Sequence, residues 1–344
     1  MATTTPSSGT EFSSELAFAG DDGGELPPGI GPWKLAWRRL RRNKVAMFFG
    51  GVFILIVVVC FLAPVYSHDV AHISPSDDSH IDHPVVIGGK KYYALTLTGT
   101  PIGPTWHSQF LLGADEQGRD LAVRLLYGGR TSLEIGVVAT LITMVFGLIL
   151  GTIGGYFRGF ADGVIRFILD LLWAFPVVIL GVALGVTLAL GGIGPLKGNS
   201  LLVPAVVVGI VYIPYVGRPV RGQVLGLRER EYIDAARQQG LSNLTIMMSE
   251  VLPNLASTIV VFLPLILANA ILLEAGLSYL GAGVQPPNAS WGTLIAAGVN
   301  KIPAGFHAVL VPGLMLVLCV MSINIFGDGV RDALDPRAKV RIGR

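Results

Sequence analysis

Charged residues are scarce in this sequence of 344 residues. They make up 14% of the chain, against 52% hydrophobic residues, whereas ordinary soluble domains carry roughly 25% charged residues. A chain with so few charges cannot cover itself with a polar surface, so a soluble globular fold is excluded. We expect the lipid bilayer to be its solvent.

Motifs for covalent or nucleotide chemistry are also missing. There are two cysteines, Cys60 and Cys319, and both stand in apolar runs, which argues against a disulfide or metal framework. The chain has no GxxxxGK[ST] motif, and the glycine-rich stretch 191–198 has the wrong spacing for one. The HExxH and GxSxG motifs are absent too. We therefore expect no enzyme activity and no nucleotide bound by this chain.

Long apolar runs are what the sequence has in abundance. Six segments approach the ~20 residues that a helix needs to cross the hydrocarbon layer, and a backbone in lipid must satisfy its own hydrogen bonds. The predicted spans are 45–66, 135–156, 167–190, 201–217, 255–273 and 308–327. The fourth is short and contains Pro204 and Pro214, so we expect it to kink or to start slightly outside the membrane. The prediction is an all-α membrane protein.

The distribution of Lys and Arg predicts the orientation of these spans. If the N-terminus is cytoplasmic, 18 of the 25 Lys and Arg residues fall in cytoplasmic segments, as the positive-inside rule requires. Both termini are then cytoplasmic, and the glycine-rich stretch 191–198 is external. The predicted divisions are a disordered leader over 1–31 without a cleavable signal, an interfacial helix and first span over 32–66, an external segment over 67–134, a core over 135–328 and a tail over 329–344.

The residues before the first span predict a helix lying in the headgroup layer. Trp33, Trp37 and Leu40 share one helical face, and basic residues surround them. The plainer alternative is a stop-transfer cluster of charges. In the external segment, residues 85–97 around Gly88 and Gly89 predict a β-hairpin.

The most informative region is the cytoplasmic loop 225–253. Residues 228–239 predict a charged helix that carries Glu231, Asp234, Ala235 and Ala236. The two alanines are small enough for another protein to approach the backbone closely. Gly240 can adopt the left-handed conformation that ends a helix, and Ser242 can cap a second helix over 243–251. After Leu252, Pro253 marks the entry to the fifth span, so the loop is a rigid helix–glycine–helix element suited to dock on a soluble partner.

This pattern of Asp234-Ala235-Ala236, three residues, Gly240 and then Leu252-Pro253 resembles the EAA loop of ABC importer permeases. Two positions depart from that family: Asp234 replaces the usual Glu, and Glu250 stands where an aliphatic residue is common. Three further stretches resemble the C-type permease of the dipeptide and oligopeptide (Dpp/Opp) importers. They are LGADEQGRD over 112–120 with RLLYGGRTSL over 124–133, EAGLSYLG over 274–281 with QPP and SWG after it, and GDGVRDALDPR over 327–337. Residue 114 departs from the usual Thr, and the external insertion 67–108 is longer than is typical.

The resemblance implies the type I importer permease fold, with six membrane helices, and a working assembly. It implies a related B-type permease as heterodimer partner, two ATP-binding subunits (D- and F-type, or one fused) that hold the ATP and Mg²⁺, and an external substrate-binding protein. This chain would then bind no cofactor, metal or nucleic acid, would sit in the bacterial cytoplasmic membrane, and would pass short peptides by alternating access. The same branch also carries nickel, opines, glutathione and oligosaccharides. A stand-alone secondary transporter and a membrane-anchored metal-binding protein remain as alternatives from other classes.

Ionisable and polar groups in the spans are candidates for the translocation path or gate. They are Glu134, Asp170, Glu274 and Asn269. The plainer expectations are an ion pair of Asp170 with Arg166, four residues earlier, water access for Glu134 and Glu274 near the external helix ends, and interhelical hydrogen bonds for Asn269 and Asn324. Four external histidines, at 68, 72, 80 and 83, read either as a solvated loop or as a metal site. Glycines at 147, 151, 154 and 155 predict close helix packing, within this chain or with the second permease.

Overall fold

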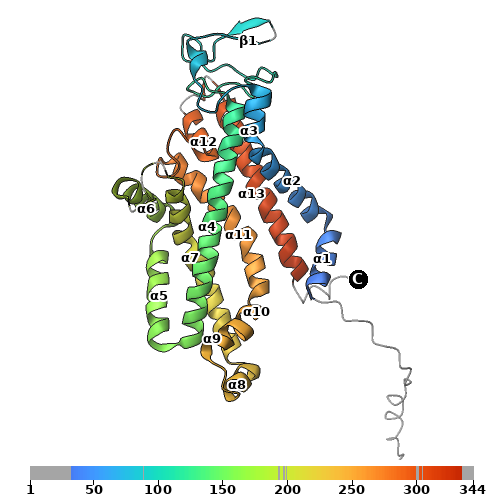
Figure 1. Ribbon diagram of the computed structural model, residues 1–344, viewed down its shortest axis with the longest axis vertical. Coiled ribbons are helices and arrows are strands. Elements are labelled where there is room, and N and C mark those ends of the chain that lie inside the picture. The colour runs from blue at the N-terminus through green and yellow to red at the C-terminus, as the bar shows by residue number, and fades with distance from the viewer. Residues whose placement is uncertain are drawn as a thin grey trace, which may run out of the picture.

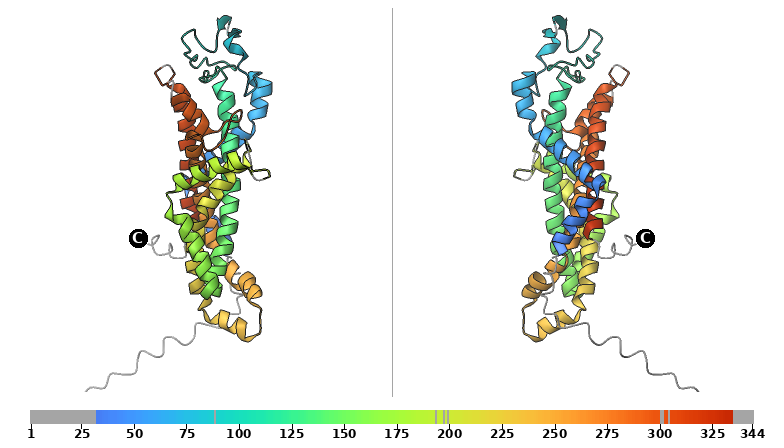
Figure 2. Two further views of the ribbon diagram at one scale, coloured as in Figure 1. Left: turned by 90° about the vertical axis from the view of Figure 1, so that its left-hand side faces the viewer. Right: turned by 90° about the vertical axis from the view of Figure 1, so that its right-hand side faces the viewer.

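The computed structural model describes residues 32–334, except positions 88, 193, 197, 199, 300, 301 and 304. In that part of the chain the protein is an elongated bundle of helices, with a small hairpin at one end and a short helical elbow at the other (Figure 1). The side views in Figure 2 place these two features at opposite ends of the long axis. The all-α prediction is confirmed. The predicted leader 1–31 and the end of the tail, 335–344, lie outside the described residues.

Five of the described helices are long and apolar enough to cross a membrane. They are α2 (Lys44–Phe61), α4 (Leu121–Phe157), α7 (Leu202–Arg228), α11 (Ala256–Tyr279) and α13 (His307–Leu334). A sixth candidate is the pair of α5 (Gly159–Ala174) and α6 (Val177–Gly191), which pass the same test only together and meet at 95°, the geometry of a broken span or of a re-entrant loop. Each of the six predicted spans therefore has a counterpart.

The third span was expected to be one helix over 167–190, and that expectation is wrong. The chain turns sharply at Phe175 and Pro176, and α6 projects sideways from the bundle (Figure 1). Pro176 has no backbone N–H to donate, and its ring disfavours a helical conformation at the residue before it. Phe175 accordingly adopts φ −95° and ψ 141°, which is extended backbone.

The fourth span is longer than expected, because α7 continues eleven residues past Gly217 to Arg228 without a break. Pro204 lies in its first turn, where no N–H is needed, while Pro214 and Pro219 lie inside the helix. Packing against α4 holds this proline-containing helix together. A side chain added at Gly147, Gly151 or Gly155 of α4 would meet α7, so this row of glycines serves packing within the chain.

The first predicted helix is present as α1 (Pro32–Arg42), which leads directly into α2. Some apolar residues of α1 are packed against another helix, and others are exposed. Ala36 and Leu40 are buried in a cluster with Ala333 of α13, whereas Trp33 and Trp37 are exposed. The two tryptophans are thus available to the headgroup layer, and Leu40 serves packing instead.

The end of the bundle opposite the elbow, predicted to be external, is a compact cap. After α2 come α3 (Ala63–Val65), the π-helix η1 (Tyr66–Ala71) and the 3₁₀ helix η2 (Ser79–Ile81). The predicted hairpin is confirmed: β1 (Val85–Ile87) pairs antiparallel with β2 (Lys90–Tyr92). The cap packs around its own small core, which includes Phe110 and Ala114. Because α4 begins at Leu121, the last part of the predicted external segment 67–134 is the upper end of that helix.

Candidate functional site

The loop between α7 and α11 forms a helical elbow. It consists of α8 (Glu231–Gln238), a turn at Gly240, α9 (Asn243–Ile246), the π-helix η3 (Met247–Val251) and α10 (Leu252–Asn254). Gly240 has φ +80°, the left-handed conformation expected for it. The Ser242 side chain accepts a hydrogen bond from the Thr245 backbone N–H at 3.2 Å, so the predicted helix cap is confirmed. Helix–glycine–helix geometry is therefore present, although the second helix is divided into three short pieces.

The inner face of the elbow packs tightly on the end of the bundle. Ile233, Ile246, Val251 and Leu255 are fully buried in one cluster with Val224 of α7. These residues come from both arms of the elbow and from the helices on either side of it. The elbow is therefore packed as one close-packed unit with the ends of α7 and α11.

The outer face of the elbow is polar, with small and apolar side chains among the charges. Glu231, Asp234 and Ala235 are exposed, and so are Leu244 and Met248. Asp234 accepts a hydrogen bond from Arg237 at 2.9 Å within the same helix. The two alanines do not act alike: Ala235 faces outward as expected, whereas Ala236 is buried against the bundle. Only one of them can admit a partner's surface.

Tyr156, at the end of α4, was missed by the sequence argument. Its hydroxyl group donates to the Asn243 side chain of α9 at 3.0 Å, and the Arg237 guanidinium lies 5.6 Å from the centre of its ring. The backbone oxygen of Tyr156 also accepts a hydrogen bond from Arg228 of α7. The sequence around Tyr156 does not indicate these contacts, because the hydrogen-bond partners lie 72 to 87 positions away in the chain.

Charged side chains form a seam between α5 and α7. Asp162 of α5 is buried and pairs with both Arg166 and Arg221, with 2.8 Å to Arg166. The expected pair of Asp170 with Arg166 is wrong. Asp170 instead accepts a hydrogen bond from Arg218 of α7 at 2.6 Å, because Arg166 is already bound to the carboxylate one turn before it.

Glu274 of α11 was expected to reach water, and that expectation is wrong as well. It is fully buried. The Ser278 hydroxyl group, one turn later in the same helix, donates to its Oε1 atom at 2.7 Å, while its Oε2 atom has no hydrogen-bond partner among the described residues. Ser132 of α4 accepts a hydrogen bond from the backbone N–H of Trp291, the first residue of α12 (Trp291–Val299), at 3.2 Å. The structure therefore places the Glu274 carboxyl group in the interior of the bundle and not at a water-exposed helix end.

The other path candidates have local partners. Glu134 is half-exposed in the single chain and accepts a hydrogen bond from Arg130 at 2.8 Å, and its access to water stays a prediction. Asn269 donates to the Leu265 carbonyl group of its own helix at 2.8 Å, and not across helices as expected. Its backbone oxygen accepts from Tyr212 of α7 at 3.3 Å.

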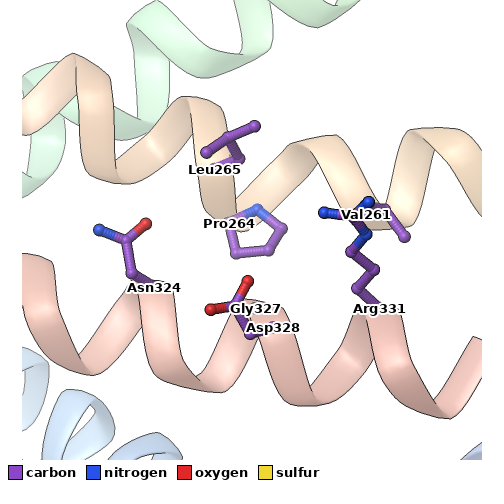
Figure 3. Close-up of a pocket in the computed structure, with 7 residues that line it drawn as sticks. All are labelled: Val261, Pro264, Leu265, Asn324, Gly327, Asp328 and Arg331. Carbon is purple, nitrogen blue, oxygen red and sulfur yellow. The ribbon is translucent and has the colours of Figure 1, made fainter.

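Asn324 makes no hydrogen bond to another helix among the described residues and instead lines a small pocket between α11 and α13 (Figure 3). The pocket is also lined by Asp328 and Arg331, two of the three charged residues of the GDGVRD stretch. Pro264 of α11 lies on the opposite wall, and a side chain added at Gly327 would collide with it. That glycine therefore permits the close approach of the two helices.

The LGADEQGRD stretch forms part of the cap and its junction with α4. The buried Asp115 pairs with Arg119 at 2.7 Å and with Arg124 at 3.1 Å, while Arg124 also donates to the Pro75 backbone oxygen. Asp120 caps the N-terminus of α4 by accepting from Ala122 and Val123. Burial raises the pKa of Asp120, and backbone hydrogen bonds act against that shift.

The external histidines do not converge. Among the described residues, no group of three or more His, Cys, Asp or Glu side chains is arranged to hold a metal ion. His68 pairs with its exposed neighbour Asp69, and His80 packs edge-on against Phe110.

Comparisons with known proteins agree with this geometry. Residues 136–340 match the family described as "Binding-protein-dependent transport system inner membrane component", and residues 31–83 match the "N-terminal TM domain of oligopeptide transport permease C". Similar proteins include the di/tripeptide transport permease DppC of Pseudomonas aeruginosa, 35% identical over 313 residues, covering 90% of this chain and 93% of that one. The glutathione transport permease GsiD of Pectobacterium atrosepticum is 34% identical over 309 residues, covering 90% of this chain and 92% of that one.

A solved structure is similar in fold alone. It is described as an inward-facing conformation of the MetNI methionine ABC transporter, with a TM-score of 0.50 and 20% identity, and it covers 62% of this chain and 96% of that one. A permease component of this kind works with ATPase and other subunits. On these grounds the chain belongs to the binding-protein-dependent transport system inner membrane components, in the branch of C-type peptide permeases, and is a multi-pass membrane permease of an ABC importer.

Proposed function

We propose that this permease carries short peptides across the bacterial cytoplasmic membrane by alternating access. The observation that carries the proposal is the similarity over nine-tenths or more of the chain to permeases named for dipeptides, di/tripeptides or peptides. Glutathione, itself a small peptide, is named for other similar permeases. The partners would be a B-type permease, two ATP-binding subunits and an external binding protein, and the chain itself would perform no covalent chemistry and bind no cofactor.

The elbow is the proposed site of coupling to the ATPase subunits. Its exposed outer face, with Glu231, Asp234 and Ala235, supports docking, and its buried inner face supports transmission to α7 and α11. A ligand or partner shifts a conformational equilibrium only through different affinities for the two states. The ATPase must therefore hold the elbow differently before and after hydrolysis, while Gly240, Leu252 and Pro253 set the shape that it holds.

The test is uptake by the full complex in proteoliposomes. We expect ATP-dependent accumulation of a labelled dipeptide or tripeptide that requires the binding protein, with an Ala235→Cys variant crosslinking to an ATPase subunit. Accumulation of Ni²⁺ or an oligosaccharide with no competition by peptides would contradict the cargo. Transport that is unaffected by removing the ATPase subunits would contradict the mechanism and favour a secondary transporter.

A further inference from the structure

The ion pair between Asp170 and Arg218 lies near the middle of the membrane-spanning region. Next to these residues in sequence, Leu169 and Gly217 touch at the α5–α7 contact, and Gly217 also faces the backbone of Gly147 in α4. Gly147 is nine residues from the cytoplasmic end of the apolar run 135–156. At 1.5 Å per residue, the pair is about 14 Å deep, roughly half of the ~30 Å hydrocarbon thickness.

Both side chains of this pair are open to their surroundings in the single chain. The Asp170 side chain is 55% exposed and the Arg218 side chain is 36% exposed. Charged side chains at the bilayer centre are costly, and they face a protein interior or a water-filled cavity. The surface that carries the pair therefore faces water or protein in the working complex, and not lipid.

The break between α5 and α6 points to the same surface independently. Phe175 and Pro176 are exposed there, and the helix axis turns by 95°. Backbone outside a helix is tolerated at membrane depth only where protein covers it or where it lines a water-filled cavity. Broken helices of this kind frequently carry substrate sites near the midplane.

Aromatic side chains surround the pair. The guanidinium group of Arg218 lies 4.6 Å from the centre of the Trp173 ring, and the Trp173 and Tyr215 rings are 4.5 Å apart. Tyr212 continues the series, with its ring 5.1 Å from that of Tyr215. The carboxylate, the guanidinium group and the Trp173 ring therefore share one open surface with the partly exposed Tyr215, whereas Tyr212 is buried.

We propose that Asp170, Arg218, Trp173 and Tyr215 form a contact station, in the water-filled path between the two permeases, for the oppositely charged ends of a peptide. This inference rests on the proposed peptide cargo and names the residues that meet it. Asp170 binds the peptide ammonium group, and Arg218 binds the peptide carboxylate through two parallel hydrogen bonds.

The pair is suited to brief contact. In the empty state the two side chains satisfy each other, and a zwitterionic cargo exchanges one ion pair for two without changing the net charge of the path. Trp173 keeps the guanidinium plane oriented through the cation–π contact. A path needs binding that is favourable enough to admit cargo and weak enough to release it, and this exchange provides both.

The first test asks whether the surface meets water, and it needs no cargo. Ala174 is exposed and lies one turn after Asp170 on the same helical face. In the full complex, Ala174→Cys is expected to react with a charged, membrane-impermeant thiol reagent, read on this chain by mass spectrometry. The native Cys60 and Cys319 are buried. Phe146→Cys, at the depth of Asp170 on the exposed apolar face of α4, is the matched control and is expected to stay unlabelled. An unreactive Ala174→Cys, as expected for a surface covered by the second permease, would overturn the proposal.

The second test measures ATP-driven dipeptide uptake by reconstituted complexes. Asp170→Asn and Arg218→Gln should each lower uptake about tenfold, because each removes one charge-assisted contact with the cargo. Peptide-stimulated ATP hydrolysis should stay within about twofold, since the elbow is unchanged. Arg166→Gln, an arginine outside the station whose partner Asp162 is also held by Arg221, should transport like the wild type.

The double variant Asp170→Asn with Arg218→Gln separates binding from structure. A neutral amide pair can keep the two helices hydrogen-bonded but has no charge for the cargo, so uptake should remain low. Uptake restored to the wild-type rate would overturn the station and leave the pair a purely structural link. If the wild-type complex transported no peptide while Ala174→Cys was labelled, the cargo assignment would fail and the water-lined surface would stand.

Discussion

Gly240 is the residue on which the shape of the elbow depends. Its φ of +80° belongs to the left-handed region, and a side chain added there would meet no other atom. Any effect of a substitution therefore comes from backbone strain and not from a clash. A β-branched residue in that conformation costs of order 1–3 kcal/mol, whereas Asn tolerates it.

We expect Gly240→Val to insert and assemble normally but to lower the ratio of peptide uptake to ATP hydrolysis by about tenfold, the equivalent of 1.4 kcal/mol. The ratio is measured in proteoliposomes. Gly240→Asn is the matched control and should keep most of the coupling, since only the strain distinguishes the two variants. Full coupling in the Val variant would contradict the role proposed for this glycine.

Two ion pairs near the cap differ in how far their side chains are buried. Asp115 and Arg124 have 4% and 6% of their side chains exposed, while Arg130 and Glu134 have 41% and 40% exposed. Asp115→Ala would leave the buried Arg124 without its counter-charge, at a cost of about 3–5 kcal/mol. Glu134→Ala should cost about 0–1 kcal/mol. Thermal unfolding of the purified complex measures both, and similar midpoints for the two variants would show that the cap contributes little to stability.

At the scale of elements, α4 and α7 are packed closely along a row of glycines. A Cβ atom at Gly151 would lie 2.7 Å from the backbone oxygen of Gly217, so the helices would have to separate. Gly163 of α5 has open space around it. These two glycines therefore allow the same substitution to be compared in a tight seam and on an open surface.

Gly151→Ala should destabilise the complex by about 1–3 kcal/mol through overpacking. Gly163→Ala should be neutral or stabilising by about 0.5–1 kcal/mol, because alanine is the better helix former. The midpoints of thermal inactivation of uptake would report the difference. A neutral Gly151→Ala would mean that α4 and α7 are packed more loosely than their contacts indicate.

At the scale of the whole molecule, the external cap and the elbow lie at opposite ends of the bundle (Figure 2). With both termini cytoplasmic, as proposed from the positive-inside rule, the elbow meets the ATPase subunits and the cap meets the outside. In intact cells, Thr98→Cys in the cap should therefore be labelled by an impermeant reagent from outside.

Ser242→Cys in the elbow, equally exposed in the single chain, is the matched variant and should react only in inverted vesicles. Labelling of Ser242→Cys in intact cells would reverse the orientation and remove the basis for coupling.

Much of this molecule is determined by local sequence. The six crossings follow from runs of apolar residues, and the ends of the elbow helices follow from Gly240 and Ser242, since their conformations depend on nearby atoms. The break at Phe175 and Pro176 was within reach of the same reasoning, because Pro restricts its own φ and the residue before it. The prediction of one continuous helix over 167–190 relied on the uninterrupted run of apolar residues and did not take the proline into account.

What tertiary structure alone decided is which distant groups meet. Asp170 pairs with Arg218 and not with its neighbour Arg166, Glu274 is buried in the interior of the bundle, and Tyr156 joins α4 to the elbow. The sequence by itself determined the six apolar segments and the helical elbow between the fourth and the fifth, because periodicity, propensity and charge act over a few residues. The partners of its buried polar groups depend on how whole helices pack, since each such group must find a hydrogen bond wherever packing places it.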